Sequence, residues 1–458
     1  MSIRRISSVA HVGNIEIGGR NPIRIQSMAT TDTNDTEGSV AQAKRIIDAG
    51  GELVRFTTQG TREAENMKNI SARLKADGYS QPLVADVHFT AHTADIAAQY
   101  CEKVRINPGN YVDPGRTFKH LEYTDAEYAE ELQKIERKLI PFINICKEHK
   151  TAVRIGVNHG SLSDRIMSRY GDTPAGIVES CMEFLRIFKR ESFNDVVISI
   201  KASNTVVMVQ SVRLLVKAMD QEDMHYPLHL GVTEAGEGED GRIKSAVGIG
   251  ALLTEGIGDT IRVSLSEEPE CEIPVARKLV DMIDECTQLR QDAESSIEAD
   301  TITLTLDAPD WETLQLKAAM AVGALLIDRK ATKLIIKKKG EDTPLTALAD
   351  GILQAARIKF TKTEYISCPG CGRTLYNLQD TIARIKAATQ HLVGLKIGIM
   401  GCIVNGPGEM ADADYGYVGA GRGKISLYKQ KVCVEKNIPE EEAVDKLLQL
   451  IAEDQKER

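Results

Sequence analysis

The stretch AVRIGVNHG at residues 152–160, followed by AGIVESCMEFLRIFKRE at residues 175–191, carries the pattern that decides the fold. The first segment is a short β-branched run typical of a strand, and the second has apolar residues at helical spacing. This strand–helix unit recurs from about residue 20 to about residue 285. The eight strand-like runs are PIRIQSM (22–28), ELVRFTT (52–58), PLVADVHF (82–89), KVRINPGN (103–110), AVRIGVNHG (152–160), VVISIKASN (196–204), LHLGVTEAG (228–236) and DTIRVSLS (259–266).

Each of these runs is apolar enough to be buried on both faces, as parallel strands are. Eight such units over ~250 residues predict a closed (β/α)₈ TIM barrel. A doubly wound open sheet is the alternative, but no Gly-rich dinucleotide-binding motif follows the first strand. We therefore expect an α/β protein in which residues 1–286 form the barrel.

Two further regions are expected after the barrel. Residues 287–362 alternate strand-like and helical patterns, which predicts an ordered β-α-β-α insert without a chemical motif. Residues 363–458 are expected to form a separate α+β domain. Its predicted elements are a helix in RTLYNLQDTIARIKAATQHL (373–392), a strand in LKIGIMG (395–401), a hairpin in GKISLYKQKVCVEKN (423–437) and a helix after Pro439.

Composition and charge narrow the function classes. The chain has 458 residues and a formal net charge of −9, which argues against general affinity for nucleic acid or an anionic membrane. The start, MSIRRISSVAHVGN, lacks the apolar core of a signal peptide, and no apolar run approaches the ~20 residues that span a bilayer. Nine cysteines are an odd number, which argues against a disulfide framework. We therefore expect a cytoplasmic protein.

Polar residues follow the strand-like runs at their carboxyl ends, which meet on the active-site face of a barrel. They are Arg55, Asp86, His88, Arg105, Asn107, Asn110, Arg154, Asn158, Lys201, Asn204, Glu234, Arg262 and Ser264. One such arginine is usually solvated or paired, but five cations on one mouth favour an anion among them. We therefore predict a small, heavily anionic substrate such as a diphosphate. The five cations are Arg55, Arg105, Arg154, Lys201 and Arg262.

A metal site is predicted in the C-terminal region. Cys368 and Cys371 form a C-x-x-C pair in SCPGCGRT, and Cys402 follows about thirty residues later beside glycines that let the backbone wrap a bulky centre. Structural zinc would normally have a fourth Cys or His, and a thioredoxin-type redox pair would need no third cysteine. An iron–sulfur cluster fits better, since thiolates hold it.

The fourth ligand of such a cluster is a separate question. The stretch CIVNGPGE offers Glu409, which the turn after Cys402 would carry back toward the metal. A carboxylate is a harder ligand than a thiolate and holds a cluster iron less firmly. Three cysteines and one glutamate therefore predict catalysis at one iron rather than electron transport alone.

The quoted motifs resemble those of a known family. SCPGCGRT, GCIVNGPGE, VRINPGN, SIKAS, LHLGVTEAG and EGIGDTIRVSL are similar to segments of the 4-hydroxy-3-methylbut-2-enyl diphosphate synthases, over roughly residues 5–285 and 363–458. The resemblance implies an oxidoreductase of the methylerythritol phosphate route to isoprenoids. It would open the ring of 2-C-methyl-D-erythritol 2,4-cyclodiphosphate and remove a hydroxyl as water, with two electrons from reduced ferredoxin or flavodoxin. The C-terminal domain would be similar to a sulfite-reductase module.

The resemblance also implies roles for residues. The family's diphosphate-binding cations match the five cations named above, and we expect His88, Asn107, Asn158 and Ser264 to contact the substrate beside them. The family's acid–base glutamate matches Glu234, which its residue type alone leaves as either a salt-bridge partner or a proton donor and acceptor. The ligands of the family's [4Fe-4S] cluster match Cys368, Cys371, Cys402 and Glu409, and the last would also be catalytic.

One feature departs from the compact bacterial form of the family, in which a short connection joins the barrel to the cluster domain. Here residues 287–362 intervene and resemble a shortened relative of a third domain found in plant and some bacterial forms. In the compact form the barrel of one subunit faces the cluster of its dimer partner. The cluster domain could therefore close over the barrel of its own chain or over that of a dimer partner. We expect a homodimer. Two other functions also stay open, namely a non-catalytic iron–sulfur carrier and a zinc-stabilised barrel lyase of the aldolase or pteroate-synthase type.

Overall fold

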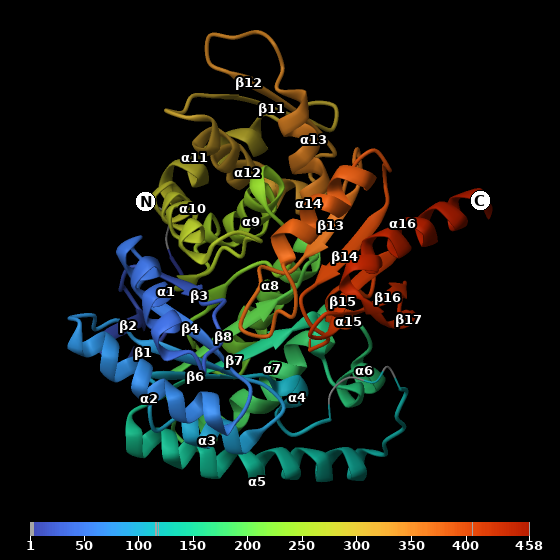
Figure 1. Ribbon diagram of the computed structural model, residues 1–458. Helices are drawn as coiled ribbons and strands as arrows, with labels where there is room; N and C mark the ends of the chain where they lie inside the picture. The colour runs from blue at the N-terminus through green and yellow to red at the C-terminus, as the bar shows by residue number, and fades with distance from the viewer. Residues whose placement is uncertain (1–3, 115–116, 118, 405, 458) are drawn as a thin grey trace.

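The computed structural model describes residues 4–114, 117, 119–404 and 406–457. Three parts follow one another along the chain: a parallel barrel, a small insert and a C-terminal domain built on its own sheet (Figure 1). The predicted α/β class and the TIM barrel are confirmed.

Eight parallel strands form the barrel in the order β8-β7-β6-β5-β4-β3-β10-β9. A parallel bridge between Ile198 and Leu228 joins the two ends of this sheet, so that the barrel is nearly closed. Every strand-like run identified in the sequence contributes one strand, although β9 and β10 have only two residues each. The bounds are β3 (Arg24–Met28), β4 (Leu53–Thr58), β5 (Leu83–Val87), β6 (Lys103–Ile106), β7 (Ala152–Asn158), β8 (Val196–Lys201), β9 (His229–Leu230) and β10 (Thr260–Ile261).

Helices between the strands cover the outside of the barrel (Figure 1). They include α1 (Thr36–Asp48), α2 (Thr61–Ala76), α3 (Ala91–Ala97), α5 (Asp125–His149), α7 (Pro174–Arg190), α8 (Thr205–Gln221), α9 (Gly238–Leu253), α10 (Glu272–Asp281) and α11 (Ile283–Ser295). In α9 every residue of the range 243–253 is buried. A helix that is buried all round needs a cover on its outer side as well, and the insert provides that cover.

A hairpin closes the amino-terminal end of the barrel. It consists of β1 (Val9–Val12) and β2 (Ile15–Gly18), which pair antiparallel. Strands of four residues carry little periodic signal, and the sequence analysis did not predict them. We call this hairpin the plug. Because it covers the amino-terminal end of the barrel, the mouth at the carboxyl ends of the strands is the end that remains open. The apolar cluster of the plug contains Ala10, Val12, Ile17, Leu53, Val84, Ala152 and Val197.

The insert contains β11 (Thr301–Leu306), α12 (Trp311–Ile327), β12 (Lys333–Lys338) and α13 (Thr346–Ala355), and its two strands pair in parallel. This is the element order expected for residues 287–362, and the barrel helix α11 spans the expected boundary at residue 286. Helix α12 lies against α9, and its residues from 313 to 327 are buried. The insert is thus joined to the barrel mainly by α12, which also contacts α10 and α11, and by the packing of α13 against α9.

The C-terminal domain has a five-stranded sheet in the order β13-β14-β15-β16-β17. The expected strand and hairpin correspond to β14 and to the β16–β17 pair. The helix expected from Arg373 begins only at Leu378, because Asn377 caps it and the preceding residues form the cysteine loop. The bounds are β13 (Glu364–Ser367), α14 (Leu378–Thr389), β14 (Lys396–Met400), α15 (Gly406–Glu409), β15 (Tyr415–Gly421), β16 (Lys424–Lys429), β17 (Val432–Pro439) and α16 (Glu440–Glu457).

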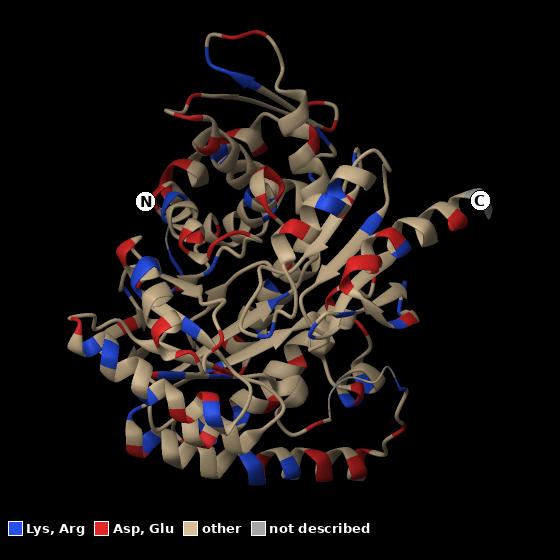
Figure 2. Cartoon of the chain, viewed as in Figure 1, with Lys and Arg blue, Asp and Glu red and all other residues tan. Residues whose placement is uncertain are grey.

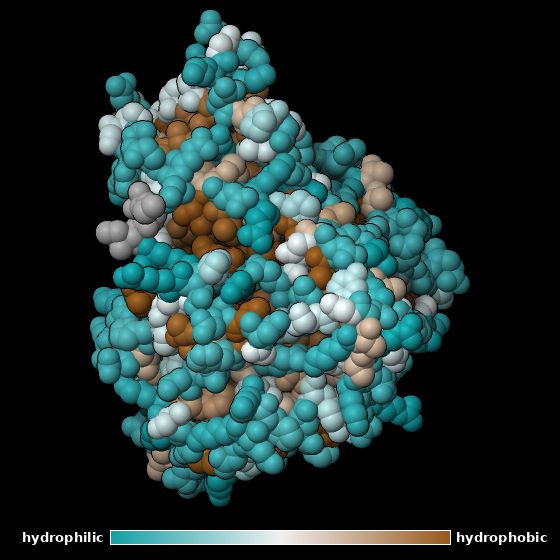
Figure 3. All heavy atoms as spheres, turned by 90° about the vertical axis from the view of Figure 1, so that its left-hand side faces the viewer, coloured by the Kyte–Doolittle hydropathy of each residue, from teal (hydrophilic) through white to brown (hydrophobic). Residues whose placement is uncertain are grey.

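Basic and acidic residues are mixed along the outer helices, and further basic residues lie on the strands inside the molecule (Figure 2). The face that forms the left-hand side of Figure 1 is mostly hydrophilic, with an apolar area in its upper half (Figure 3). Within the described ranges no helix combines the length and apolar character needed to cross a membrane. Because arginine and lysine are rarely buried without a partner, the basic side chains inside the barrel require an explanation.

We predict that the contact between α9 and α12 tolerates no side chain at Gly323. A Cβ there would lie 2.7 Å from the Val247 carbonyl oxygen. Gly323→Val should therefore lower the free energy of unfolding by about 1–3 kcal/mol through overpacking, measured by urea denaturation followed by circular dichroism. Gly351→Ala is the matched control, because its Cβ would meet Ile243 Cδ1 at an ordinary 3.4 Å. Equal stability of Gly323→Val and the native chain would contradict the prediction.

Candidate active site and metal centre

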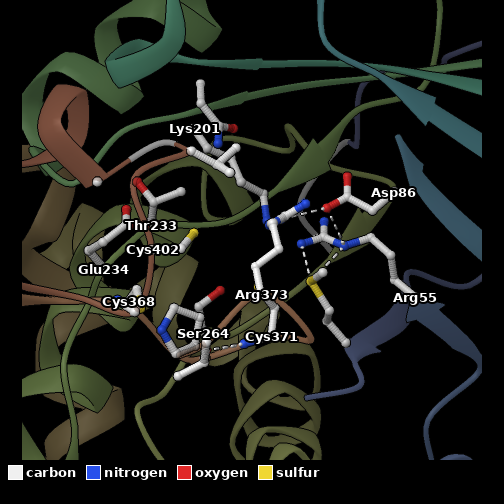
Figure 4. A pocket seen from close by; sticks show the side chains of 18 of the residues that line it. Arg55, Asp86, Lys201, Thr233, Glu234, Ser264, Cys368, Cys371, Arg373 and Cys402 are labelled. Atoms are coloured by element: carbon white, nitrogen blue, oxygen red, sulfur yellow. Dashed lines mark hydrogen bonds and ion pairs between the residues drawn. The ribbon is translucent and has the colours of Figure 1, made fainter. Parts of the chain in front are cut away.

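A cavity of about 90 Å³ lies between the barrel mouth and the C-terminal domain, and residues of both parts line it (Figure 4). The barrel contributes Met28, Arg55, Asp86, His88, Arg105, Arg154, Asn158, Lys201, Thr233, Glu234, Arg262 and Ser264. The C-terminal domain contributes, among others, Cys368, Cys371, Arg373, Met400 and Cys402. The barrel and the cysteine loops therefore meet within one chain, which is one of the two arrangements left open by the sequence.

Direct contacts hold the C-terminal domain over the mouth. Ser266 Oγ donates a hydrogen bond to the Cys368 carbonyl oxygen at 3.0 Å. On the other side of the mouth, α15 packs against the turn at residues 159–161. A Cβ on Gly408 would lie 1.6 Å from the Gly160 carbonyl oxygen, so only glycine fits there. These contacts fix both cysteine loops above the strand ends.

Buried carboxylates accompany three of the five predicted cations, since Arg55 Nε lies 4.0 Å from Asp86 Oδ2 and closer ion pairs hold Arg105 and Arg262. Arg105 Nη1 donates to Asp86 Oδ1 at 2.9 Å. Burial by itself would raise the pKa of Asp86, but the charges of Arg55 and Arg105 hold it well below its ordinary value. Arg262 forms a two-point ion pair with Glu272, with Nε–Oε2 at 3.0 Å and Nη2–Oε1 at 2.8 Å. These two carboxylates fix the orientation of Arg105 and Arg262.

Arg154 and Lys201 have no such partner. Neither forms an ion pair within the described part of the chain, and Nε and Nη1 of Arg154 lack hydrogen-bond partners there. Burial, followed by neighbouring cations such as Arg55, lowers the pKa of both groups well below their ordinary values. Gly231 leaves room for Lys201, since an added Cβ would lie 2.7 Å from Nζ. Buried cations without a counter-charge are stabilised by a bound anion, so this side of the cavity is suited to an anionic ligand.

Two residues predicted to contact the ligand have other partners in the structure. Burial and the charge of Arg105 lower the pKa of His88 to about 3, so the imidazole is neutral. Arg105 Nη1 donates to His88 Nε2, and Nδ1 faces the Asn110 amide at 3.1 Å. Asn107 is not among the residues that line the cavity, because its side chain caps α4 (Pro108–Tyr111). Both side chains orient neighbouring groups, and of the four residues His88, Asn158 and Ser264 line the cavity while Asn107 does not.

Glu234 and Glu409 form a buried carboxyl pair between the two domains. Thr233 Oγ1 donates to Glu409 Oε2 at 3.0 Å, whereas Glu234 Oε2 and Glu409 Oε1 are buried without a hydrogen-bond partner among the described residues. Burial, and then the Glu234 charge, raise the pKa of Glu409 well above its ordinary value, and burial also raises the pKa of Glu234. Buried carboxyl groups with raised pKa values retain a proton at a pH at which exposed carboxyl groups have lost it. The pair can therefore donate a proton to a ligand in the cavity.

The three predicted thiols line the same cavity. Burial raises the pKa of the Cys368 thiol to about 12, so this thiol requires a cation or a metal to become a thiolate. The Gly401 amide donates to Cys368 Sγ at 3.2 Å. Amide–sulfur hydrogen bonds of this kind are typical of the second shell of iron–sulfur clusters.

The donor set of the three thiols fits an iron–sulfur cluster. Cys368, Cys371 and Cys402 line one cavity. Thiolates are the ligands of iron–sulfur clusters, which distribute them over several iron atoms. Among the residues that the structure describes, no group of three or more His, Cys, Asp or Glu side chains is arranged around a single metal ion.

Arg373 is a site residue that the sequence analysis did not identify. It follows Cys371 in SCPGCGRT, and its side chain extends from the cysteine loop to the barrel (Figure 4). There Arg373 Nη2 donates to Asp86 Oδ2 at 3.3 Å. The available signal was a basic residue two positions after a C-x-x-C pair, but its partner lies 287 residues away in the sequence.

Comparison with known proteins identifies relatives over nearly the whole chain. The GcpE TIM-barrel domain matches residues 7–277, and the GcpE protein C-terminal domain matches residues 364–453. The 4-hydroxy-3-methylbut-2-en-1-yl diphosphate synthase (flavodoxin) of Bacteroides fragilis is 53% identical over 597 positions, which cover 98% of this chain and 95% of the relative. The protein of the same name from Porphyromonas gingivalis is 46% identical, over 99% of each chain.

The alignments also show a difference in length. The alignment with the Bacteroides fragilis protein has 597 positions against the 458 residues of this chain, so at least 139 positions of the relative have no counterpart here. Among solved structures, N-acetylneuraminic acid synthetase from Leptospira borgpetersenii has a TM-score of 0.38 at 13% identity, over 64% of this chain and 94% of the other. The matches to both domains, and the identity of about half of all aligned positions, lead to one conclusion: the chain belongs to the GcpE family of 4-hydroxy-3-methylbut-2-en-1-yl diphosphate synthases.

Proposed function

We propose that the cavity between the two domains is where this chain converts 2-C-methyl-D-erythritol 2,4-cyclodiphosphate to 4-hydroxy-3-methylbut-2-enyl diphosphate. The reaction is a reductive ring opening and dehydroxylation in isoprenoid biosynthesis, and it consumes two electrons and one proton. Reduced flavodoxin, or alternatively ferredoxin, supplies the electrons. One observation carries the proposal: partnerless buried cations and three cysteines, from separate domains, line one cavity.

The barrel side binds the diphosphate. Arg154 and Lys201 offer charge that no described carboxylate neutralises, and Arg55 lies beside them. Arg105 and Arg262 are held in place by Asp86 and Glu272. Cations that are already oriented and shielded from water bind phosphate oxygens without reorganisation, which favours both affinity and alignment.

The C-terminal side holds a [4Fe-4S] cluster through Cys368, Cys371 and Cys402, with Glu409 as the fourth ligand. When bound, this cluster supplies one-electron transfer and an iron with an exchangeable ligand. The chain's own residues keep water out, because α15 and the cysteine loops close the mouth.

The carboxyl pair supplies the proton. The departing hydroxyl leaves as water only if a proton reaches it, and the raised pKa values of Glu234 and Glu409 favour a retained proton on this pair. Thr233 orients this pair through its 3.0 Å hydrogen bond to Glu409. Glu234 would deliver the proton, in agreement with its place on the cavity wall.

In this function residues 1–286 bind the substrate, and residues 363–458 hold the cluster. Residues 287–362 support the contact between these two parts. Because the described site residues come from one chain, a homodimer is not needed to complete the site. A cytoplasmic location is proposed as well, since reducing conditions there keep the nine free cysteines as thiols.

Replacing Glu409 tests its role in the cluster domain. Glu409→Ala should retain iron and sulfide, because three cysteines remain, but should lose activity by about 100-fold or more with the ligand and proton donor removed. Anaerobic turnover of the cyclic diphosphate with a chemical reductant measures the loss, and iron analysis checks the cluster. Glu441→Ala, an exposed carboxylate of the same domain, is the control. Full activity of Glu409→Ala would exclude this residue from the mechanism.

Replacing Glu272 tests how the Arg262 guanidinium is oriented. Glu272 also accepts hydrogen bonds from Ser27 Oγ at 2.7 Å and the Leu265 amide at 3.2 Å. Glu272→Gln should keep part of this geometry and raise KM for the cyclic diphosphate by about tenfold, with a smaller change in kcat. Steady-state kinetics measure the changes in KM and kcat separately, and a thermal unfolding curve confirms that the variant is folded.

The control for this experiment is Glu270→Ala. Glu270 lies two residues away and pairs with half-exposed Arg45 outside the cavity. The KM of Glu270→Ala for the cyclic diphosphate should equal that of the native chain. An unchanged KM in folded Glu272→Gln would show that Arg262 needs no orientation by Glu272.

A further inference from the structure

Arg373 belongs to the cysteine loop, yet its guanidinium lies in the barrel mouth (Figure 4). The residue is only 8% exposed. Its Nη2 donates to Asp86, but Nε and Nη1 have no hydrogen-bond partner within the described part of the molecule. A buried guanidinium with two unused donors is costly unless a ligand accepts from them.

Asp86 cannot neutralise Arg373 alone, because the same carboxylate serves three guanidinium groups. Arg105 lies at 2.9 Å, Arg373 at 3.3 Å and Arg55 at 4.0 Å from its oxygens. One negative charge shared by three cations leaves a local excess of positive charge. Arg373 therefore adds to the anion-binding character of the mouth, although it comes from the other domain.

We propose that Arg373 is a substrate-binding residue that donates from Nε and Nη1 to the diphosphate of the cyclic substrate. This role rests on the function proposed above. It follows that the diphosphate is bound by five cations of the barrel and by one of the C-terminal domain. The substrate then links the two domains, and its binding stabilises their closed arrangement.

The distribution of charge supports a phosphate ligand for these donors. Two barrel cations, Arg154 and Lys201, line the same cavity and form no ion pair with any described residue, and Arg154 has unused donors like those of Arg373. Phosphate oxygens accept several charge-assisted hydrogen bonds at once, and arginine is well suited to donate them. A diphosphate therefore satisfies donors on both sides of the cavity in a way that a single neutral ligand cannot.

The test compares dissociation constants of the cyclic diphosphate on oxygen-free, cluster-loaded protein by isothermal titration calorimetry. Arg373→Met should weaken binding by about tenfold or more, the usual loss for a charge-assisted hydrogen bond. Arg373→Lys keeps the positive charge but loses the planar guanidinium with its several donors. Its dissociation constant should lie between those of Arg373→Met and the native chain. Iron and sulfide analysis of each protein confirms that the cluster is retained.

Lys386→Met is the matched control. Lys386 Nζ pairs with Glu237 Oε1 at 3.0 Å across the same two domains, but neither residue lines the cavity. The affinity of Lys386→Met for the cyclic diphosphate should stay within about twofold of the native value. The contact that this variant loses is a partly exposed ion pair outside the cavity. An equal loss in Lys386→Met and Arg373→Met would show a general effect of domain contact and would overturn the proposed role.

A second readout is the rise in melting temperature on adding the cyclic diphosphate, which follows from binding to the folded state. The rise should be smaller for Arg373→Met than for the native chain. Native affinity in Arg373→Met, with its cluster intact, would overturn the role of Arg373 and leave the proposed function standing. Failure of the native, cluster-loaded chain to bind the cyclic diphosphate would overturn both.

Discussion

Cations buried together with too little counter-charge are the constraint on which the rest of this structure depends. Arg55, Arg105, Arg154, Lys201 and Arg262 come from five different strands and meet at one mouth, where Asp86 and Glu272 are the carboxylates paired with them. Such an arrangement is stable only in a rigid frame and with an anion to bind. The closed barrel, the apolar plug at its other end and the glycine that makes room for Lys201 supply that frame.

The C-terminal domain completes the site because its cysteine loops face the same mouth. The contact of α15 with the turn at residues 159–161 places Glu409 beside Glu234, so that a proton-holding pair spans the domain boundary. The barrel thus selects and orients an anion, and the C-terminal domain contributes the thiols and one half of the carboxyl pair. Neither part alone contains all the groups that the reaction needs.

The insert takes part in holding these domains together. Glu364, the first residue of β13, pairs with Lys244 of the barrel helix α9 and with Arg357, which follows the insert helix α13. The close packing of α9 with α12 anchors the insert to the barrel at the same place. At least 139 positions of the Bacteroides fragilis protein have no counterpart in this chain. In this chain α12 and α13 join the insert to the barrel, and Arg357 joins it to the C-terminal domain.

The sequence by itself determined the eight-strand period, the cations at the strand ends and the three cysteines, because strand periodicity and motif spacing are local properties of the chain. Only the tertiary structure decided which cations are neutralised: Glu272 and Arg262 are separated by few residues, but nothing in their spacing indicates an ion pair. It also decided that His88 is neutral, that Asn107 caps a helix and that Arg373 reaches Asp86. Burial, pairing and contact between distant segments depend on how the chain packs, and residue order does not express them.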